Sequence, residues 1–567
     1  MNKKPVPSNL SGKTDLNNNS HNSHQQIDNR DGLDRRSFLW RLGCATTLVG
    51  LSSLKLPNLE SEAEAEELGP LKYSRRRNFA QKIRLDAAKL AKHRPTVTHS
   101  TNGEEELYHN KIANYSKGLP HNNLGEVDLS AYNALLSALS TGNPDDFEAI
   151  PMGDSRKLTN PQAGLAFDLE GPDSHHLSIR PSPTIAGTEA ASELAEVYWM
   201  ALVRDVYFMY YDSSATIHAA VSELSAFSDF RGPKSSGNVT PETIFRGNTE
   251  GDLIGPYISQ FLWLDIPMGA LRIPQAMYTV MPGIDYLTAY NDWLNIQNGA
   301  AAMPYMHDPV PRYIRNLRDM AEWVHMDALY QAYHQACLIL LGMGAPLNPG
   351  NPYVHSNTQI GFGTFGGPHV LSLVTEVATR ALKAAWFQKW FVHRRLRPEA
   401  FGGLVHHTRY GTASYPVNHE ILNSIAVDRI FSAHGSYLLP LAYPEGSPTH
   451  PSYCAGHATV AGACVTILKA LFDESFVISN PVVPDASGIS LLPYVGDDLT
   501  VGNELNKLAA NVALGRNAAG IHYRSDYTES IKLGENVAIG ILQEQKATYN
   551  EHVSFTFTRF DGTTVTI

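Results

Sequence analysis

Five basic side chains stand at or near the ends of apolar stripes, and their chemical types suit an oxyanion. Lys389 and Arg397 lie eight positions apart, His457 begins an apolar run, and Arg516 and His522 follow a third apolar stripe. Arginine offers a flat fork of donors and lysine a point charge. Burying so much positive charge without a partner is prohibitive. The pattern therefore predicts one tetrahedral oxyanion shared by all five.

A predicted helix must place His457. The stretch 449–457 is followed at once by the apolar run 458–472, which at helical spacing predicts a buried helix with His457 at its start. A helix start offers unpaired N–H groups and the positive end of the dipole, so the Gly456 amide becomes a donor for an anion. Alone, a histidine at such a position is more often structural, so its meaning depends on the other stretches.

A second helix must place Lys389. It begins at Gly367-Pro368, with proline in a favoured first-turn position, and its apolar stripe ends at Lys389. Pro398 disfavours helix at Arg397, so we expect the chain to turn there and bring both cations to one place. Taken singly, Lys389 would more often extend its stem to solvent.

A third helix carries Arg516 at the end of its apolar stripe, and Gly520 is expected to end it before His522. Ser525 or Asp526 then caps a last helix that runs to about residue 544. Asp526 is either a cap alone or a residue that also orients His522.

Further patterns complete a mainly α-helical prediction. Core helices are expected over 188–210 and 320–343, and the tail 553–567 alternates around Asp561-Gly562 as a β-hairpin does. Asp265 lies in an apolar stretch broken by prolines. A carboxylate in so apolar a stretch is rarely left unpaired, and a solvent-facing position is the alternative.

Composition and the N-terminal stretch bear on partners and location. The chain has 567 residues and a net charge of -11 with mixed signs, which disfavours a nucleic-acid or anionic-membrane partner. A polar stretch to about residue 29, expected to be disordered, precedes Arg35-Arg36 and a short apolar run, an order that resembles a twin-arginine export signal. That run is too short to span a bilayer. The resemblance to an export signal therefore leads us to expect export to the periplasm or beyond.

Three blocks of residues together resemble a known family. These are Lys389-(seven residues)-Arg397-Pro398, then 451–457 (Pro-Ser-Tyr-Cys-Ala-Gly-His), then Arg516-(five residues)-His522-(three residues)-Asp526. They resemble the signature of vanadium-dependent haloperoxidases, which share it with type 2 phosphatidic acid phosphatases. The flanks, from about 187 to 544, look like the bromoperoxidase branch.

The resemblance implies a fold and a division of the chain. We expect a mainly α protein with helical bundles of the vanadium haloperoxidase and acid phosphatase type and a small C-terminal β-hairpin. The expected parts are a disordered N-terminus with the export signal (1–66), a peripheral helical and loop layer (67–186), a catalytic helical-bundle domain (187–548) and the hairpin (549–567).

The resemblance also implies roles. His522 would be the axial ligand of vanadium, while Lys389, Arg397, Arg516 and the Gly456 amide would hold the oxygens of vanadate. The catalytic residues would be His457, as the acid–base group, with His450 and Lys389. His450 matches a histidine that marks bromoperoxidases. Asp526 and Asp265 would lie next to the residues that hold vanadate, without contacting vanadate themselves.

The implied reaction uses hydrogen peroxide to oxidise bromide, and iodide, to hypohalous acid that halogenates an organic acceptor. Vanadate would be the cofactor, a structural calcium is expected without assigned residues, and a homo-oligomer is expected. One departure concerns Ala455, where the family usually has a serine that bonds a vanadate oxygen. Two alternatives stay open: an exported acid phosphatase with His522 as nucleophile, and a non-catalytic relative that binds an anion.

Overall fold

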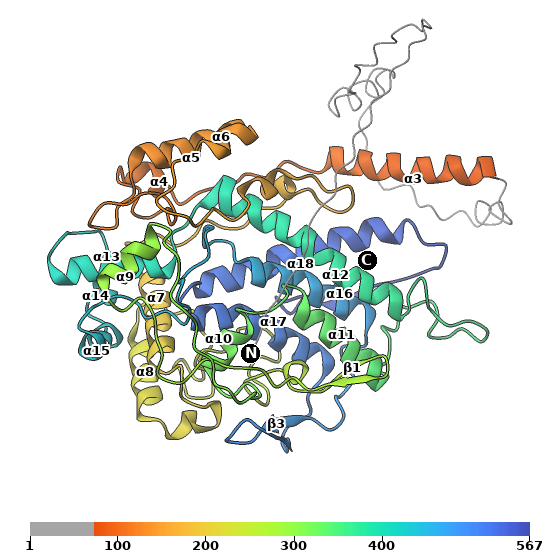
Figure 1. Ribbon diagram of the computed structural model, residues 1–567. Coiled ribbons are helices and arrows are strands. Elements are labelled where there is room, and N and C mark those ends of the chain that lie inside the picture. Colours follow the sequence, from red (N-terminus) through yellow and green to blue (C-terminus); the bar gives the residue numbers. More distant parts are fainter. Residues whose placement is uncertain (1–72) are drawn as a thin grey trace, which may run out of the picture. The chain divides into compact units, whose positions relative to one another are not determined.

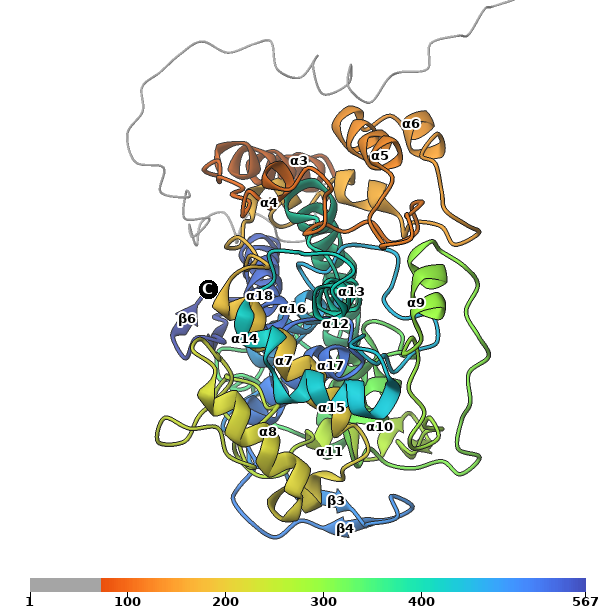
Figure 2. The ribbon, with the colours of Figure 1, turned by 90° about the vertical axis from the view of Figure 1, so that its left-hand side faces the viewer.

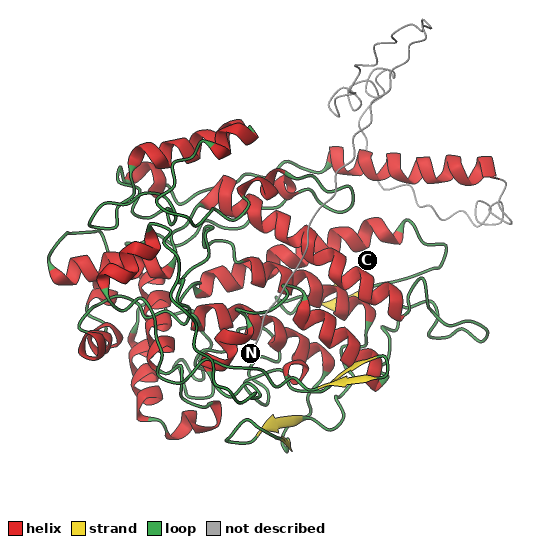
Figure 3. Ribbon diagram, in the orientation of Figure 1, coloured by secondary structure: helices red, strands yellow, loops and turns green. Residues whose placement is uncertain are grey.

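The part of the chain that the computed structural model describes, residues 73–567, is mainly helical, with short strands at its edges (Figure 3). These residues belong to one compact unit, Ala65–Ile567. The expected N-terminal part, 1–66, with its twin-arginine motif, lies outside the described residues. The division near residue 186 into a peripheral layer and a catalytic domain stays a prediction.

The α-helices of the described residues are α3 (Tyr73–His93), α4 (Glu104–Leu107), α5 (Leu129–Thr141), α6 (Pro144–Glu148), α7 (Thr188–Leu202), α8 (Ala215–Ala226), α9 (Tyr290–Gln297), α10 (Leu317–Trp323), α11 (Gln331–Met343), α12 (Gly367–Phe387), α13 (Pro398–Tyr410), α14 (His419–Leu422), α15 (Ile425–His434), α16 (Gly456–Leu471), α17 (Val501–Ala518) and α18 (Arg524–Lys546). Short 3-10 turns are η1 (Pro161–Leu165), η2 (Ser174–His176), η3 (Phe208–Ser213) and η4 (Gln260–Leu262), and η5 (Gln388–His393) is a π-helical turn.

Helix α16 lies at the centre of the largest hydrophobic cluster and packs against α12, α17 and α18 (Figure 1). Two glycines let α16 and α18 approach closely. A Cβ on Gly462 would sit 2.0 Å from the Ile531 carbonyl oxygen, and one on Gly534 would sit 1.8 Å from the Thr459 oxygen. Only glycine fits at either position, so the two helices that carry His457 and Asp526 are held backbone to backbone.

A second hydrophobic cluster gathers around α7, which packs against α8, α14 and α15 (Figure 2). It includes buried residues of α13 and the segment after α17. A third, smaller cluster joins α5 to Ala385 and Trp386 at the end of α12 and to Trp390 in η5. Packing therefore fixes the end of α12 and the start of α13 from several sides.

The strands form three antiparallel pairs. The C-terminal pair, β5 (Thr556–Thr558) and β6 (Thr564–Thr566), turns at Gly562 with φ of 82° and so confirms the predicted hairpin. The other two pairs were not predicted: β1 (Ile266–Met268) with β2 (Leu271–Ile273), and β3 (Val482–Pro484) with β4 (Leu491–Pro493). The expectation of a mainly α fold is confirmed.

Two predicted helices are wrong in extent. The one expected over 320–343 is two helices, α10 and α11, separated by residues 324–330. The separating segment leaves helical conformation because its groups bond residues elsewhere in the chain, as described below. The one expected over 188–210 ends at Leu202, after which the Arg204 guanidinium is held by the carbonyl oxygens of Ala518 and Pro440.

Among the described residues, no helix combines the length and the apolar character that crossing a bilayer requires.

Candidate active site

Lys389 lies in the π-helical turn η5, which continues α12. Its side chain is fully buried, and Nζ donates to the backbone oxygens of Pro451 (2.6 Å) and Ser452 (2.9 Å). Burial and the nearby Arg397 guanidinium hold the pKa of Lys389 well below its usual value. The inward stripe of α12 therefore delivers an ammonium group to the segment that precedes α16, as predicted.

Arg397 directly precedes α13, and Pro398 occupies the first turn of that helix. Its Nε donates to the His450 carbonyl oxygen at 3.0 Å, and one terminal nitrogen donates to Nδ1 of the His450 ring at 2.9 Å. The other donates to the Ile521 carbonyl oxygen at 2.8 Å and lies 2.9 Å from Nε2 of His522. Burial lowers the pKa of the guanidinium to about 10. One side chain thus joins three predicted site elements.

Asp526 fixes the tautomer of His522. Nδ1 of His522 lies 2.6 Å from an Asp526 carboxylate oxygen, which can only accept. Nε2 faces Arg397, which can only donate, so the proton sits on Nδ1 and Nε2 keeps its lone pair. Burial, and then the charge of Arg397, hold the pKa of His522 well below its usual value. The ring is therefore neutral and presents a free basic nitrogen.

Asp526 is itself surrounded by donors. It accepts from the Ser452 hydroxyl, from the Tyr523 N–H at 3.2 Å and from Arg395 at 2.9 Å. Although burial alone raises its pKa, the bonds from His522 and Arg395 hold the pKa of Asp526 well below its usual value. Helix α18 starts at Arg524, so Asp526 is in its first turn: it caps the Tyr523 amide and also orients His522.

His457 stands in the first turn of α16, beside Gly456. Its Nε2 lies 3.0 Å from Oδ1 of Asp327. Burial lowers the pKa of His457, Asp327 opposes that shift, and the Arg516 charge adds to it. At the N-cap of the same helix, the Ala455 amide donates to the Ser530 hydroxyl at 2.8 Å, and the Ala455 side chain offers no polar atom.

Arg516 completes the set from the last turn of α17. One terminal nitrogen donates to the Val324 carbonyl oxygen at 2.6 Å, and the guanidinium carbon lies 5.7 Å from the Tyr443 ring centroid. Its Nε is buried without a hydrogen-bond partner. The segment 324–327 between α10 and α11 therefore holds both Arg516, through Val324, and His457, through Asp327.

The electrostatics of the site are unusual because its three cations have no carboxylate of the described residues in direct contact, although Asp526 and Asp327 contact the two histidines. Within residues 73–567, Lys389, Arg397 and Arg516 make no ion pair with a carboxylate; they donate to carbonyl oxygens and, from Arg397, to histidine nitrogens. Most other buried arginines have carboxylate partners, such as Arg395 with Glu193 and Asp526, Arg524 with Glu196 and Arg318 with Asp205. Arg246 is an exception that donates to the carbonyl oxygens of Gly255 and Pro256. A buried group of cations without acids is a site for an anion.

The structure brings most predicted residues together. Direct contacts join Lys389, Arg397, His450, His522 and Asp526 through the segment 450–452. Segment 324–327 joins His457 and Arg516, because Asp327 contacts His457 and Val324 accepts from Arg516; His457 also follows closely the segment 450–452 that Lys389 contacts.

The placement of Asp265 in support of the site is wrong. Its side chain is exposed and lines a cavity of about 330 Å³ with Arg272, away from the cations. The solvent-facing alternative holds, because the residue directly precedes β1 and only its neighbour Ile266 turns inward.

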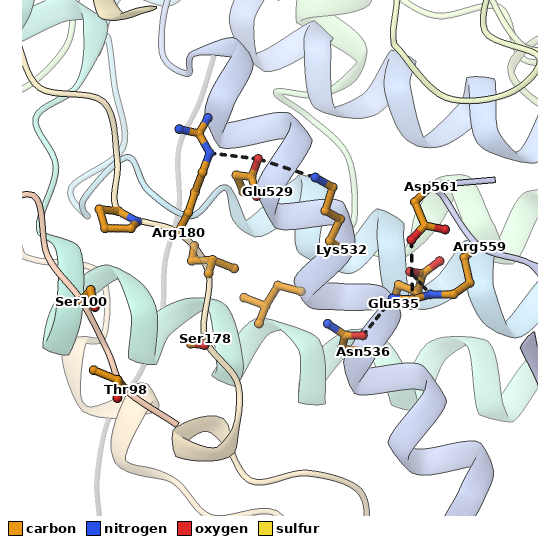
Figure 4. Close-up of a pocket in the computed structure, with 13 residues that line it drawn as sticks. Thr98, Ser100, Ser178, Arg180, Glu529, Lys532, Glu535, Asn536, Arg559 and Asp561 are labelled. Atoms are coloured by element: carbon orange, nitrogen blue, oxygen red, sulfur yellow. Dashed lines mark hydrogen bonds and ion pairs between the residues drawn. The ribbon is translucent and has the colours of Figure 1, made fainter. Parts of the chain in front are cut away.

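A larger cavity, of about 420 Å³, also lies apart from the site, against α18 (Figure 4). Its cations are matched by acids: Arg180 lies 3.1 Å and Lys532 lies 3.7 Å from Glu529, and Arg559 lies 2.9 Å from Glu535. Because each charge already has a partner, this cavity lacks the unpaired positive charge that marks the buried site.

Sequence reasoning missed three residues that act on the site: Asp327, Ser452 and Arg395. Ser452 stands inside the recognised block, so its position was a usable signal. Asp327 lies in a stretch that the periodicity assigns to a helix, and Arg395 stands beside other arginines from which nothing local distinguishes it.

Comparison with known proteins agrees with this geometry. Residues 429–551 match a family model described as the second helical-bundle domain of VCPO. A vanadium-dependent bromoperoxidase of Corallina pilulifera is 39% identical, over 85% of this chain and 97% of that protein. One of Ascophyllum nodosum is 38% identical, over 82% and 88%.

A solved structure supports the same relationship. The homohexameric structure of the second vanadate-dependent bromoperoxidase from Ascophyllum nodosum superposes with a TM-score of 0.84 at 29% sequence identity, over 93% of this chain and 95% of that one.

Proposed function

The chain belongs to the vanadium-dependent bromoperoxidases, and we propose that Lys389, Arg397, Arg516 and His522 hold the vanadate with which it oxidises bromide by hydrogen peroxide. The observation that carries this assignment is the group of three buried cations without a carboxylate partner. A tetrahedral oxyanion would neutralise all three at once.

The donors of the site fit such a group. Lys389 has three N–H donors and uses two, and Nε of Arg516 is buried and unpartnered. The Gly456 amide stands at the positive end of α16. Nε2 of His522 keeps a lone pair for vanadium, at the cost of its contact with Arg397. When bound, vanadate supplies a Lewis-acid centre that activates hydrogen peroxide toward halide.

Asp526 prepares His522 as a ligand. Its carboxylate takes the Nδ1 proton and stabilises the tautomer that leaves Nε2 free, the arrangement common behind metal-bound histidines. Ser452 and Arg395 in turn orient Asp526. The chain of contacts from Arg395 to His522 is buried throughout, so the ligand is held in place before the cofactor binds.

His457 is the acid–base group in this proposal. Oxidation of bromide by hydrogen peroxide to hypobromous acid and water consumes one proton, so the site must deliver one in each turnover. His457 is half-buried, whereas Lys389, Arg397, Arg516 and His522 are buried, so His457 stands between solvent and the cations. Asp327 orients the ring and raises its pKa toward the working range.

We propose that His450 assists the reaction with halide, as the matching histidine of bromoperoxidases suggests. Its ring centroid lies 4.7 Å from that of Trp386, and its Nδ1 accepts from Arg397. His450 thereby keeps the guanidinium turned toward the centre while its Nε2–H stays available. Together with the bromoperoxidase relatives, this histidine supports bromide and iodide as the substrates, with an organic acceptor for the hypohalous acid.

We propose a homo-oligomer as well, supported by the homohexameric relative. The motif at Arg35-Arg36 supports export by the twin-arginine pathway to the periplasm or beyond. A structural calcium is a prediction without assigned residues; in the range 73–567 no group of three or more His, Cys, Asp or Glu side chains is placed to hold a metal.

One assay tests the function. Metal-free enzyme receives bromide and hydrogen peroxide with and without vanadate, and hydrolysis of p-nitrophenyl phosphate is measured in parallel. Vanadate-dependent bromide oxidation is the expected result. Phosphate ester hydrolysis without bromide oxidation would favour the phosphatase alternative, and neither activity would favour an anion-binding protein.

A further inference from the structure

Exposed methionines are concentrated near one edge of the site. Met326 lies in the segment between α10 and α11 and is 68% exposed, while Met303 and Met306 are 55% and 57% exposed. Met281 joins them, because its N–H donates to the Met306 carbonyl oxygen at 3.2 Å. A thioether is among the side chains that hypohalous acids oxidise most readily. Methionines near the site are therefore exposed to oxidation by the hypobromous acid that the proposed reaction makes.

Met326 lies in the chain segment that contacts the site. Its neighbours in sequence hold the two site residues described above: Val324 accepts from Arg516, and Asp327 contacts His457. The His457 side chain is 16% exposed, whereas Lys389, Arg397, Arg516 and His522 are buried, so segment 324–327 borders the most exposed residue of the site. Any product that leaves past His457 passes the segment that carries Met326.

The other methionines border the same segment. The Tyr305 ring, between Met303 and Met306, lies 5.3 Å from the His325 ring, and His307 contacts Glu322 at 2.9 Å. His325 and Glu322 flank Val324 at the end of α10. The methionines therefore lie in chain segments next to residues 324–327. We term the four of them the methionine rim: Met281, Met303, Met306 and Met326.

The thiols of the described residues show the opposite distribution. Cys337, Cys454 and Cys464 are fully buried, and burial raises their pKa values, which keeps them as unreactive thiols. Thiols can be oxidised irreversibly, whereas a methionine sulfoxide can be reduced back. The thiols of these three cysteines are therefore shielded from oxidant, whereas the methionine thioethers near residues 324–327 are exposed.

We propose that the methionine rim is a site of self-modification, in which hypobromous acid leaving the site oxidises Met326 first and then its neighbours to the sulfoxide. The thioether sulfur attacks the bromine of HOBr and displaces hydroxide; water then adds to the sulfur, bromide leaves and two protons are lost, one of them to the hydroxide. Overall, the thioether and HOBr give the sulfoxide, bromide and a proton. The sulfur is oxidised, bromine is reduced, and bromide returns to the enzyme. This inference rests on the proposed function, which supplies the oxidant.

The experiment compares two equally exposed methionines in the whole, vanadate-loaded enzyme. Met326 is 68% exposed and follows the end of α10. Met209 is 61% exposed and lies in η3, whose Phe208 N–H donates to the Arg315 carbonyl oxygen, before the start of α10. The enzyme turns over bromide and peroxide in the presence of excess free methionine, which removes hypobromous acid from bulk solution. Peptide mass spectrometry then measures sulfoxide at both positions.

We expect the ratio of Met326 to Met209 sulfoxide to exceed one several-fold during turnover. Hypobromous acid added from outside should instead give a ratio near one, and peroxide without bromide should give little sulfoxide at either position. Equal ratios for internally generated and added oxidant would overturn the proposal. Halogenation of an added acceptor is measured in parallel samples without free methionine, so loss of the proposed function would show there as no halogenated product at all.

A variant separates position from intrinsic reactivity. Met326→Leu preserves size and apolar character. The proposed mechanism gives the Met326 side chain no role in bromide oxidation, so the initial rate of bromide oxidation should equal that of wild type. Its sulfoxide should then shift to Met306 and Met303. If Met209 gains sulfoxide instead, the rim is not the exit.

Discussion

Asp526→Asn probes the site most sharply, because it preserves shape and removes one charge. Every group around the Asp526 carboxylate donates: His522 Nδ1–H, the Ser452 hydroxyl, the Tyr523 N–H and Arg395. An asparagine must turn its NH₂ group toward some of them. If it faces His522, it drives the imidazole proton to Nε2 and removes the lone pair that vanadium needs; if it faces Arg395, it opposes a guanidinium.

The expected loss follows from the role of such partners. Replacing the group that orients a metal-bound histidine typically costs 10–100-fold in affinity, so we expect vanadate to bind Asp526→Asn weaker by about one to two decades. That is about 1.4 to 2.7 kcal/mol of binding free energy. Arg395 keeps Glu193 as a partner, so the fold should survive.

Vanadate titration of the metal-free variant, followed by recovery of bromide oxidation, measures the change, and thermal unfolding checks the fold. Asp265→Asn is the matched control, because that carboxylate is exposed and apart from the site. Vanadate affinity in Asp526→Asn equal to that of wild type and of the control would refute the assignment of the His522 tautomer.

Further expectations follow from individual residues. Ala455→Ser restores a hydroxyl at the N-cap of α16 and should tighten vanadate binding by about one to two decades through a charge-assisted bond of about 1.5 to 3 kcal/mol, measured by titration; unchanged affinity would mean that position 455 does not face the oxyanion. His457→Ala should retain vanadate yet lose bromide oxidation by roughly a hundred-fold or more, measured as turnover at saturating vanadate. Asp327 raises the pKa of His457, so Asp327→Asn should move the alkaline limb of the pH profile to lower pH, and an unmoved limb would argue against this pairing. Burial lowers the pKa values of His121 and His406 to about 4, so the unfolded chain binds more protons below about pH 6.5, and the free energy of unfolding of the metal-free protein should fall as pH drops from there toward 4; denaturant titration across that range would show constant stability if the rings were solvated.

The positions of Lys389, Arg397, Arg516 and His522 could be predicted because each lies at or next to the end of a helix that the sequence marks. The apolar stripe of α12 leads to Lys389, Pro398 fixes the turn at Arg397, and Gly520 separates Arg516 from His522 with a φ of 86°. Local rules on periodicity, proline and glycine suffice for these positions. They also place His457 at the start of α16.

Contacts between distant parts of the chain could not be predicted in this way. The apolar periodicity over 320–343 indicates one helix, yet tertiary bonds from Arg516 and His457 to Val324 and Asp327 break it. Arg395 finds Glu193, which lies 202 residues earlier, and nothing local distinguishes it from its arginine neighbours. The role of such residues depends on which helices meet, and only the folded structure supplies that.

A crystal structure of the enzyme soaked in vanadate would show directly whether Lys389, Arg397, Arg516 and His522 surround one oxyanion. We expect vanadium bonded to Nε2 of His522, with its oxygens within hydrogen-bond distance of Lys389, Arg397 and Arg516 and of the Gly456 amide. Vanadate bound at another place, or bound here without a bond to His522, would contradict it.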